Sequence, residues 1–431
     1  MTTTRHSTEK ETEVLRLTEH LFRHEAGRLV SVLTGIFGLH RLQMAEDVVQ
    51  EAMARALKTW VYYGVPENPP AWLMQTAKHL ALDIVRREKR FREKQSAVMT
   101  YLEQRMPDAG LADGPLLEGE LRDDRLRLMF ACCHPHLPQA MQIGLALKTL
   151  CGFSPAEISK AFLTTEAAII KRLTRARQRL QADHIRFEIP AGPELAPRLE
   201  GVLRTLYLLF NEGYKASSGD RFVREELCAE AIRLAGILAE HPAGGQPQVH
   251  ALLALMLLNA ARLPARTDPD GNFVRMEHQD RSRWDRSMIQ RGIYHLGRSA
   301  GGATLNEYHL QAGIAACHCL AVSDADTDWK RILSLYDHLL EIDDSPVVAL
   351  NQAVAAAKVY GAAEGIARLE GILERNALSD YYLAHAVLGD LERQRENPSA
   401  AACHFAKALK MTEVKAEREL ISQRLRECAA L

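Results

Sequence analysis

The feature that most constrains the fold of this chain is a helical period in its apolar residues, which recurs along most of its 431 positions. Ala, Leu, Glu and Arg dominate, and runs of β-branched residues are scarce. Apolar residues repeat at the three- and four-residue spacing of an amphipathic helix. The sequence therefore predicts an all-α protein. One turn signal, Asp268 to Asn272, favours a simple turn over a calcium loop, because the alternating acidic ligands and the distal Glu of such a loop are missing.

Charge and hydropathy limit the class of protein. Residues 1–187 carry a net charge of +5 and the remainder −6, which gives the overall −1. A mildly basic N-terminal part is typical of contact with phosphates. No apolar run approaches the ~20 residues of a membrane helix, and the first residues lack the apolar stretch of a signal peptide. We therefore expect a cytoplasmic protein without membrane contact.

Breaks in the helical period divide the chain into three parts. Residues 104–120 are acidic, contain Pro and Gly and lack periodicity, and a second break lies at 189–193. We expect a helical domain at 12–96, a flexible linker at 97–119, a smaller domain at 120–187, and a large helical domain at 194–431.

The last of these parts is repetitive. Helical pairs are predicted to begin near Leu305, Pro346 and Ser379, and the second helix of each pair follows Asp328, Gly361 and Asn397. This spacing is typical of stacked helical hairpins of the tetratricopeptide type.

The clearest local pattern is a helix-turn-helix in residues 153–180. Ser154 and Glu157 form a capping box, which predicts a helix start, and a Thr follows that can cap a second helix. That second helix places Ile169, Leu173, Ala176 and Leu180 on one stripe, with Lys171, Arg172, Arg175 and Arg179 off it. A second helix with a basic outer face is the element that enters the major groove of DNA. The alternative is an ordinary helical hairpin with a solvated basic face.

Two further helices carry polar faces. Residues 66–94 predict a long helix with an apolar inner stripe and a basic outer face, which carries Gln75, His79, Arg86, Lys89 and Arg90. Trp72 at its start either packs in the core or stacks on a base. The helix at 45–60 presents Asp47, Gln50 and Glu51 outward. Both outer faces also fit the ordinary surface of a globular protein.

Taken together, three motifs resemble one family. Residues 45–52, 70–73 and 81–87 are similar to region 2 of extracytoplasmic-function sigma factors, and 153–158 with 171–177 resemble their region 4. Residues 207–214 and 280–285 are similar to the helical extension of a subgroup of these factors. The resemblance implies two small helical sigma domains, region 2 and a helix-turn-helix region 4, followed by a large helical-repeat domain.

The resemblance also implies partners, namely the RNA polymerase core enzyme and promoter DNA. The helix with Asp47, Gln50 and Glu51 would bind core polymerase. The minus-ten element would be contacted by Gln75, Lys78, His79, Arg86 and Arg87, and a flipped base would be held by the loop from Tyr62 to Pro69. The minus-thirty-five element would be read by Lys171, Arg172 and Arg175, within a basic segment that also holds Arg177 and Arg179. Ile170 and His79 depart from the residues common at their positions, which leaves the promoter sequence open.

Other functions are weighed against this one. No nucleotide-binding, zinc-protease or serine-hydrolase motif is present, so no enzyme, cofactor or metal is expected. The clusters at Cys132 to His136 and Cys317 to Cys319 lack the two-residue gaps of a zinc motif. A polymerase-independent helix-turn-helix regulator, with a ligand- or protein-sensing repeat domain, remains the alternative. We hypothesise that residues 194–431 control the sigma domains, through an intramolecular or protein partner.

Overall fold

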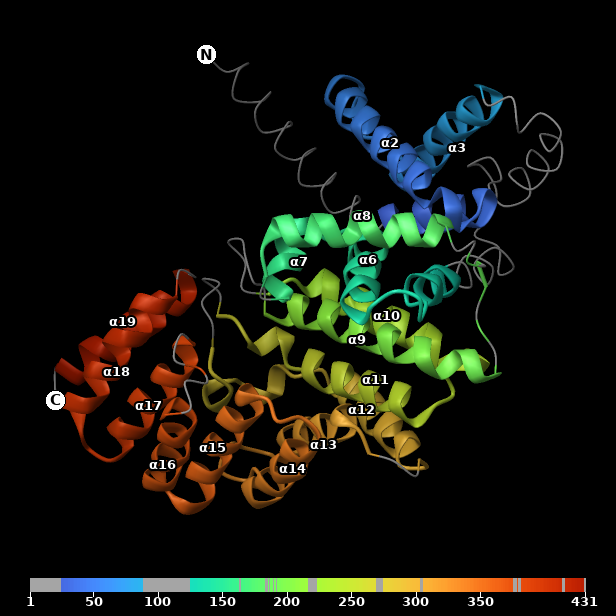
Figure 1. Cartoon of the computed structure of the whole chain (residues 1–431). Helices are drawn as coiled ribbons and strands as arrows, with labels where there is room; N and C mark the ends of the chain where they lie inside the picture. The colour runs from blue at the N-terminus through green and yellow to red at the C-terminus, as the bar shows by residue number, and fades with distance from the viewer. Residues whose placement is uncertain are drawn as a thin grey trace, which may run out of the picture. The chain divides into compact units, whose positions relative to one another are not determined.

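The computed structural model describes residues 25–87, 125–162, 164–182, 185, 187–188, 190, 192–215, 223–268, 274–302, 305–374, 378, 381–412 and 415–429. Within these ranges the chain is built from α- and 3-10 helices, and no strand is present, which confirms the all-α prediction (Figure 1). The turn predicted near Asp270 and the whole of the predicted linker, 97–119, lie outside the described residues. Contacts divide the chain into two compact units, residues 1–209 and 210–431, and each is described by itself.

Unit 1 contains the helices of the predicted DNA-binding part. A helix at residues 25–37 is followed by η1 (Leu39–Arg41), α2 (Leu42–Tyr63) and α3 (Pro69–Arg87). After a helix at 125–132 come α6 (Gln139–Cys151), α7 (Pro155–Ala161) and α8 (Glu166–Ala182), and then η3 (Gly192–Glu194) and α9 (Leu195–Tyr214), which contains the unit boundary. Figure 1 shows α2 and α3 as a pair that meets at one end.

Local signals explain where the helices of unit 1 begin. The Asn68 side chain accepts a hydrogen bond from the backbone N–H of Ala71 at 3.1 Å, at the start of α3. The Ser154–Glu157 capping box forms as predicted, because each side chain accepts from the other's backbone N–H at 3.2 and 2.8 Å. Thr165 accepts from Ala168 N–H at 3.3 Å and begins α8.

The first part of unit 2 is built around one buried helix. α10 (Glu225–Glu240), α11 (Pro247–Ala260) and α12 (Arg286–Ser299) pack together, with short η4 (Pro242–Gly244), η5 (Leu263–Ala265), η6 (Met276–His278) and η7 (Arg281–Arg283) between them. Nearly every residue of α11 is buried, as expected for a helix that is apolar on all sides. The segment Pro247–Ala265 is long and apolar enough to cross a membrane, contrary to the sequence expectation, but 83% of its apolar window is buried within the protein.

Helical hairpins complete unit 2. They are α13 (Glu307–Leu320) with α14 (Trp329–Ile342), α15 (Pro346–Tyr360) with α16 (Ala362–Glu374), and α17 (Tyr382–Gln394) with α18 (Pro398–Met411), followed by α19 (Lys415–Ala429). The predicted helix starts are confirmed to within about three residues. Asp328 and Asn397 cap α14 and α18, and Gly361 turns the chain between α15 and α16 at φ +98°. Small and large residues share the cores between helices: Ala353 and Leu369 belong to one cluster, and Ala401 and Phe405 belong to another.

Two helical glycines test this packing. A methyl group at Gly389 of α17 would lie 2.7 Å from the ring of Phe405, whereas one at Gly371 of α16 would meet nothing within 4 Å. We predict that Gly389→Ala lowers the free energy of unfolding by about 1–3 kcal/mol through overpacking. Gly371→Ala should raise it by about 0.5–1 kcal/mol, because alanine favours the helix. Chemical denaturation of the full chain measures both, and changes of the same sign would contradict this packing.

Candidate nucleic-acid interface

The outer face of α2 carries the three residues predicted to bind polymerase. Asp47, Gln50 and Glu51 are all exposed, while the opposite face of the helix is buried. Two of the three have neighbours on the same helix: Gln43 Nε2 donates to Asp47 Oδ1 at 2.8 Å, and Arg55 Nε donates to Glu51 Oε1 at 2.9 Å. Exposed contacts of this kind contribute only about 0–1 kcal/mol and exchange readily for contacts with a partner.

Aromatic residues lie on both sides of the loop between α2 and α3. Trp60 is buried and Trp72 half-buried, and their rings meet edge to face with centroids 5.5 Å apart. Trp72 therefore has a packing role, which was one of its two predicted roles. Tyr62 and Tyr63, in contrast, are 84% and 88% exposed at the end of α2, where Gly64 turns the chain at φ +84°. The exposure of this aromatic pair could not be inferred from residue type.

The predicted polar face of α3 is described over its first half. Gln75 and His79 are exposed and Lys78 is half-buried. Arg86 and Arg87 lie in the last turn of α3, but their side chains are outside the description, and Lys89 and Arg90 lie outside the described residues altogether. The structure therefore brings Gln75, Lys78 and His79 together on one helix.

The α7–α8 pair has the packing that the sequence predicts. Its inner stripe, Ile169, Leu173, Ala176 and Leu180, is buried. Lys171, Arg175 and Arg179 are exposed and Arg172 is half-buried, and Arg179 also donates to the carbonyl of His136 at 3.4 Å. Ile170 is 48% exposed on the same outer surface. The second helix thus presents cations around one apolar side chain.

Arg177 differs from the other basic residues of α8 that the sequence predicts to contact DNA. Its Nε lies 2.9 Å and its Nη2 2.8 Å from Oε2 of Glu46, whose other oxygen accepts from Thr149 Oγ1 at 2.8 Å. Glu46 is only 6% exposed. The sequence prediction gave Glu46 no role. Glu46 lies three residues before the buried Val49, so its carboxylate is at the border of an apolar stripe. A carboxylate in that position needs a partner.

The cysteines near this contact are not poised for reaction. Burial raises the pKa of Cys133 to about 12, and burial with the neighbouring Cys133 and Glu46 raises that of Cys132 well above its usual value. Neither thiol is therefore ionised near neutral pH, as a metal ligand or nucleophile would be. In the described part of the chain, no group of three or more His, Cys, Asp or Glu side chains could hold a metal ion.

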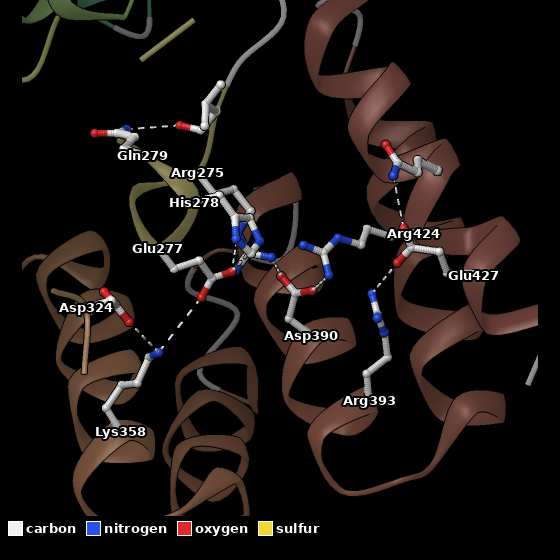
Figure 2. A network of polar contacts seen from close by, with 12 residues as sticks. Arg275, Glu277, His278, Gln279, Asp324, Lys358, Asp390, Arg393, Arg424 and Glu427 are labelled. Atoms are coloured by element: carbon white, nitrogen blue, oxygen red, sulfur yellow. Dashed lines mark hydrogen bonds and ion pairs between the residues drawn. The ribbon is translucent and has the colours of Figure 1, made fainter. Parts of the chain in front are cut away.

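A second polar cluster lies within unit 2 and links its parts (Figure 2). Glu277 lies 3.3 Å from Arg275 and 3.9 Å from Lys358, and Arg275 pairs with Asp390 of α17 at 2.9 Å. Asp390 in turn lies 3.4 Å from Arg424 of α19. The acidic residues of this segment are thus neutralised by cations, which fits an anchor for the 275–279 segment better than a catalytic group.

The motif residues quoted for the C-terminal extension also have packing roles. Asp285 caps α12 by accepting from Met288 N–H at 2.9 Å. Arg281 donates to the carbonyls of His318 and Ala321 at 2.7 and 2.8 Å and lies over the buried ring of Trp284. These contacts join the 280–285 segment to the end of α13.

The aromatic residues of α2 give a test of which side chains are structural. We predict that Trp60→Ala lowers the free energy of unfolding by about 3–5 kcal/mol, because it empties a buried site. Tyr63→Ala, on the same helix, should change it by no more than about 0.5 kcal/mol, because the ring is exposed. Denaturant titration of the full chain provides the measurement. A large loss on Tyr63→Ala would show that its ring is buried against the protein.

Comparison with known proteins finds two family matches and one similar protein. Residues 21–91 match the family described as Sigma-70 region 2, and residues 198–300 match a family of unknown function, DUF6596. The uncharacterized protein R00370 of Rhizobium meliloti (strain 1021) is 39% identical over 392 residues, which are 90% of this chain and 91% of that protein. No solved structure matches the chain.

The region 2 match covers α2 and α3. Region 2 of sigma-70 factors is the part that binds core RNA polymerase, which supports the polymerase as a partner of this chain. The chain belongs to the same family as R00370, and its sigma-70 region 2 domain supports its being a sigma-70 family factor.

Proposed function

We propose that this protein is an extracytoplasmic-function sigma factor, which directs RNA polymerase to specific promoters and acts in the cytoplasm. The observation that carries the proposal is the region 2 match on α2 and α3, in a chain whose α7 and α8 have the packing of a helix-turn-helix with a basic outer face. A regulator that binds DNA without polymerase would need only the second of these features.

The polymerase contact is assigned to the exposed face of α2. Asp47, Gln50 and Glu51 offer two carboxylates and an amide on consecutive turns of one helix. Such a face complements a basic helical surface on a partner, and its charges steer the encounter.

Contact with the melted minus-ten strand is assigned to α3 and the loop before it. Gln75, Lys78 and His79 supply hydrogen bonds and charge, and the proposal extends to Trp72, Arg86, Arg87, Lys89 and Arg90. Flipping a base out of the duplex costs a few kcal/mol. Stacking on an exposed aromatic ring returns about 1–3 kcal/mol per base, and Tyr62 and Tyr63 are the exposed rings beside this loop.

Reading of the minus-thirty-five duplex is assigned to α8. Lys171, Arg172 and Arg175 supply the cations that reach phosphates and guanine edges. The assignment extends to Arg179 and to Arg177, which pairs with Glu46 in this structure. The exposed Ile170 offers an apolar surface, and apolar side chains contact the methyl group of thymine. A thymine opposite Ile170 is therefore the expected preference at one position.

We assign control of the sigma domains to the C-terminal helices. Three helical hairpins in succession, α13 to α18, resemble tetratricopeptide stacks, which bind peptides or partner helices on a concave face.

Linking two weak DNA modules raises the effective concentration of the second to the millimolar range, so neither needs high affinity alone.

The polymerase assignment predicts the effect of charge reversal on α2. The full chain should co-purify with core RNA polymerase, and the double variant Asp47→Lys, Glu51→Lys should not, because like charges would then face the basic partner surface. Arg233→Glu, a surface change in unit 2, is the control and should leave co-purification intact. Absence of co-purification for the unmodified chain would favour the regulator that acts without polymerase.

The duplex assignment predicts a graded loss along α8. On a duplex selected from a random library by the polymerase complex, Arg175→Ala should weaken binding by about 1–3 kcal/mol and relax the preference at one position. Gln181→Ala, an exposed residue nearer the end of the same helix, should have little effect, because the first turns of a recognition helix read the bases. Equal effects of the two variants would count against base reading by α8.

A further inference from the structure

A buried guanidinium in unit 2 has only uncharged partners. Arg262 lies just after α11 and is 5% exposed. Its Nη2 donates to Tyr214 Oη at 2.7 Å and to Asn259 Oδ1 at 2.5 Å, and its Nη1 donates to Met276 Sδ at 3.1 Å. Among the residues that the structure describes, its Nε has no acceptor, and no carboxylate forms an ion pair with the side chain. The positive charge of Arg262 is therefore buried without a counter-charge.

A second guanidinium lies close to the first. The backbone N–H of Asp285 donates to the carbonyl of Ala261 at 2.8 Å, which places the 281–285 segment beside Arg262. The side chain of Arg281, in this segment, is only 10% exposed. Its Nη1 donates to two backbone carbonyls, whereas its Nη2 is buried without a hydrogen-bond acceptor in the described part of the chain.

One carboxylate serves both this guanidinium and a lysine. Asp324 lies 3.9 Å from Arg281 Nη2 and 3.6 Å from Lys358 Nζ. Within the described ranges, Arg281 forms no other ion pair. The two buried guanidiniums therefore have less than one carboxylate between them. Buried charges in proteins are normally paired, because the water that they lose on burial has to be replaced.

The uncharged groups nearby indicate the same excess of positive charge. Burial and three nearby cations lower the pKa of His318 to about 3, so its imidazole is neutral near pH 7. The cations are Arg262, Arg281 and Lys358. The ring of Trp284 lies 4.7 Å from Arg281 Cζ. Its Nε1 and the Nδ1 of His318 are also buried without a hydrogen-bond partner among the described residues.

We propose that Arg262 and Arg281 form a binding site for a small organic carboxylate. Its oxygens accept from Arg262 Nε and Arg281 Nη2, since guanidinium N–H groups match a carboxylate in both charge and geometry. One negative charge balances two guanidiniums that share one carboxylate, which favours a carboxylate over a doubly charged phosphate. Tyr214 and Met276, which both contact Arg262, offer apolar surface to the rest of the molecule.

The cluster extends to the protein surface at Asp324, which is half-buried, and Lys358, which is exposed (Figure 2). A small molecule approaches the guanidiniums from this side. Its binding does not depend on the proposed function. Where that function holds, the carboxylate is a signal to which the C-terminal helices respond, and this step alone rests on the sigma assignment.

The first experiment is calorimetric titration of the full chain with sodium acetate, hexanoate and benzoate at constant ionic strength. Each should bind at one saturable site, and the two apolar carboxylates should bind more tightly than acetate. Arg262→Met and Arg281→Gln should each weaken binding by about tenfold or more, because each removes a charge-assisted hydrogen bond. Arg283→Gln, an exposed neighbour of Arg281, is the matched control and should leave binding unchanged.

Thermal unfolding followed by circular dichroism separates loss of binding from loss of folding. Benzoate should raise the unfolding temperature of the unmodified chain and of Arg283→Gln, because it binds only the folded state. It should not raise that of Arg262→Met. This variant removes an unbalanced buried charge, so its own helices should persist. If it does not fold, Arg281→Gln provides the same comparison.

Three results would overturn the site. They are the absence of saturable binding for all three carboxylates, undiminished binding by folded Arg262→Met or Arg281→Gln, and tighter binding of inorganic phosphate than of any carboxylate. Run-off transcription with core polymerase tests the proposed function separately. Carboxylate binding by a chain that starts no transcript would leave the site intact and count against the sigma assignment.

Discussion

Unit 1 is organised around a carboxylate that the apolar faces of its helices bury and that two side chains distant in sequence stabilise, one by its charge and one by a hydrogen bond. Glu46 lies beside the buried stripe of α2, and Thr149 and Arg177 supply its hydrogen bonds. A buried ion pair is favourable only while its geometry is complete, so this contact permits one arrangement of the surrounding helices and disfavours others.

Unit 2 is organised by side-chain size and by a few caps. Small residues such as Ala353 allow the hairpins to approach, and Phe405 fills the space that Gly389 leaves. Polar residues of the 275–285 segment serve as anchors and caps. Arg275 pairs with Asp390 of α17 (Figure 2), Arg281 donates to a carbonyl of α13, and Asp285 caps α12. The match to a family of unknown function, at residues 198–300, covers the 275–285 segment.

The sequence predicted the helices and their starts well, because apolar period, Pro and capping residues are local signals. The hairpins after Pro346 and Asn397 and the capping box at Ser154 are examples. It did not predict the Glu46–Arg177 contact, since partners 131 residues apart leave no local trace. Nor did it predict that Tyr62 and Tyr63 are exposed while Trp60 is buried. The exposure of these rings depends on where α2 ends and not on residue type. The predicted roles of the polar residues on α2, α3 and α8 stay predictions.

The central claim is that this chain gives RNA polymerase its promoter specificity. The most direct measurement is run-off transcription with purified core polymerase on a library of promoter fragments. The account predicts transcripts of defined start from a subset of fragments only when the chain is present, and a shared sequence upstream of their starts. A full set of fragments on which the chain and core enzyme together start no transcript would contradict it.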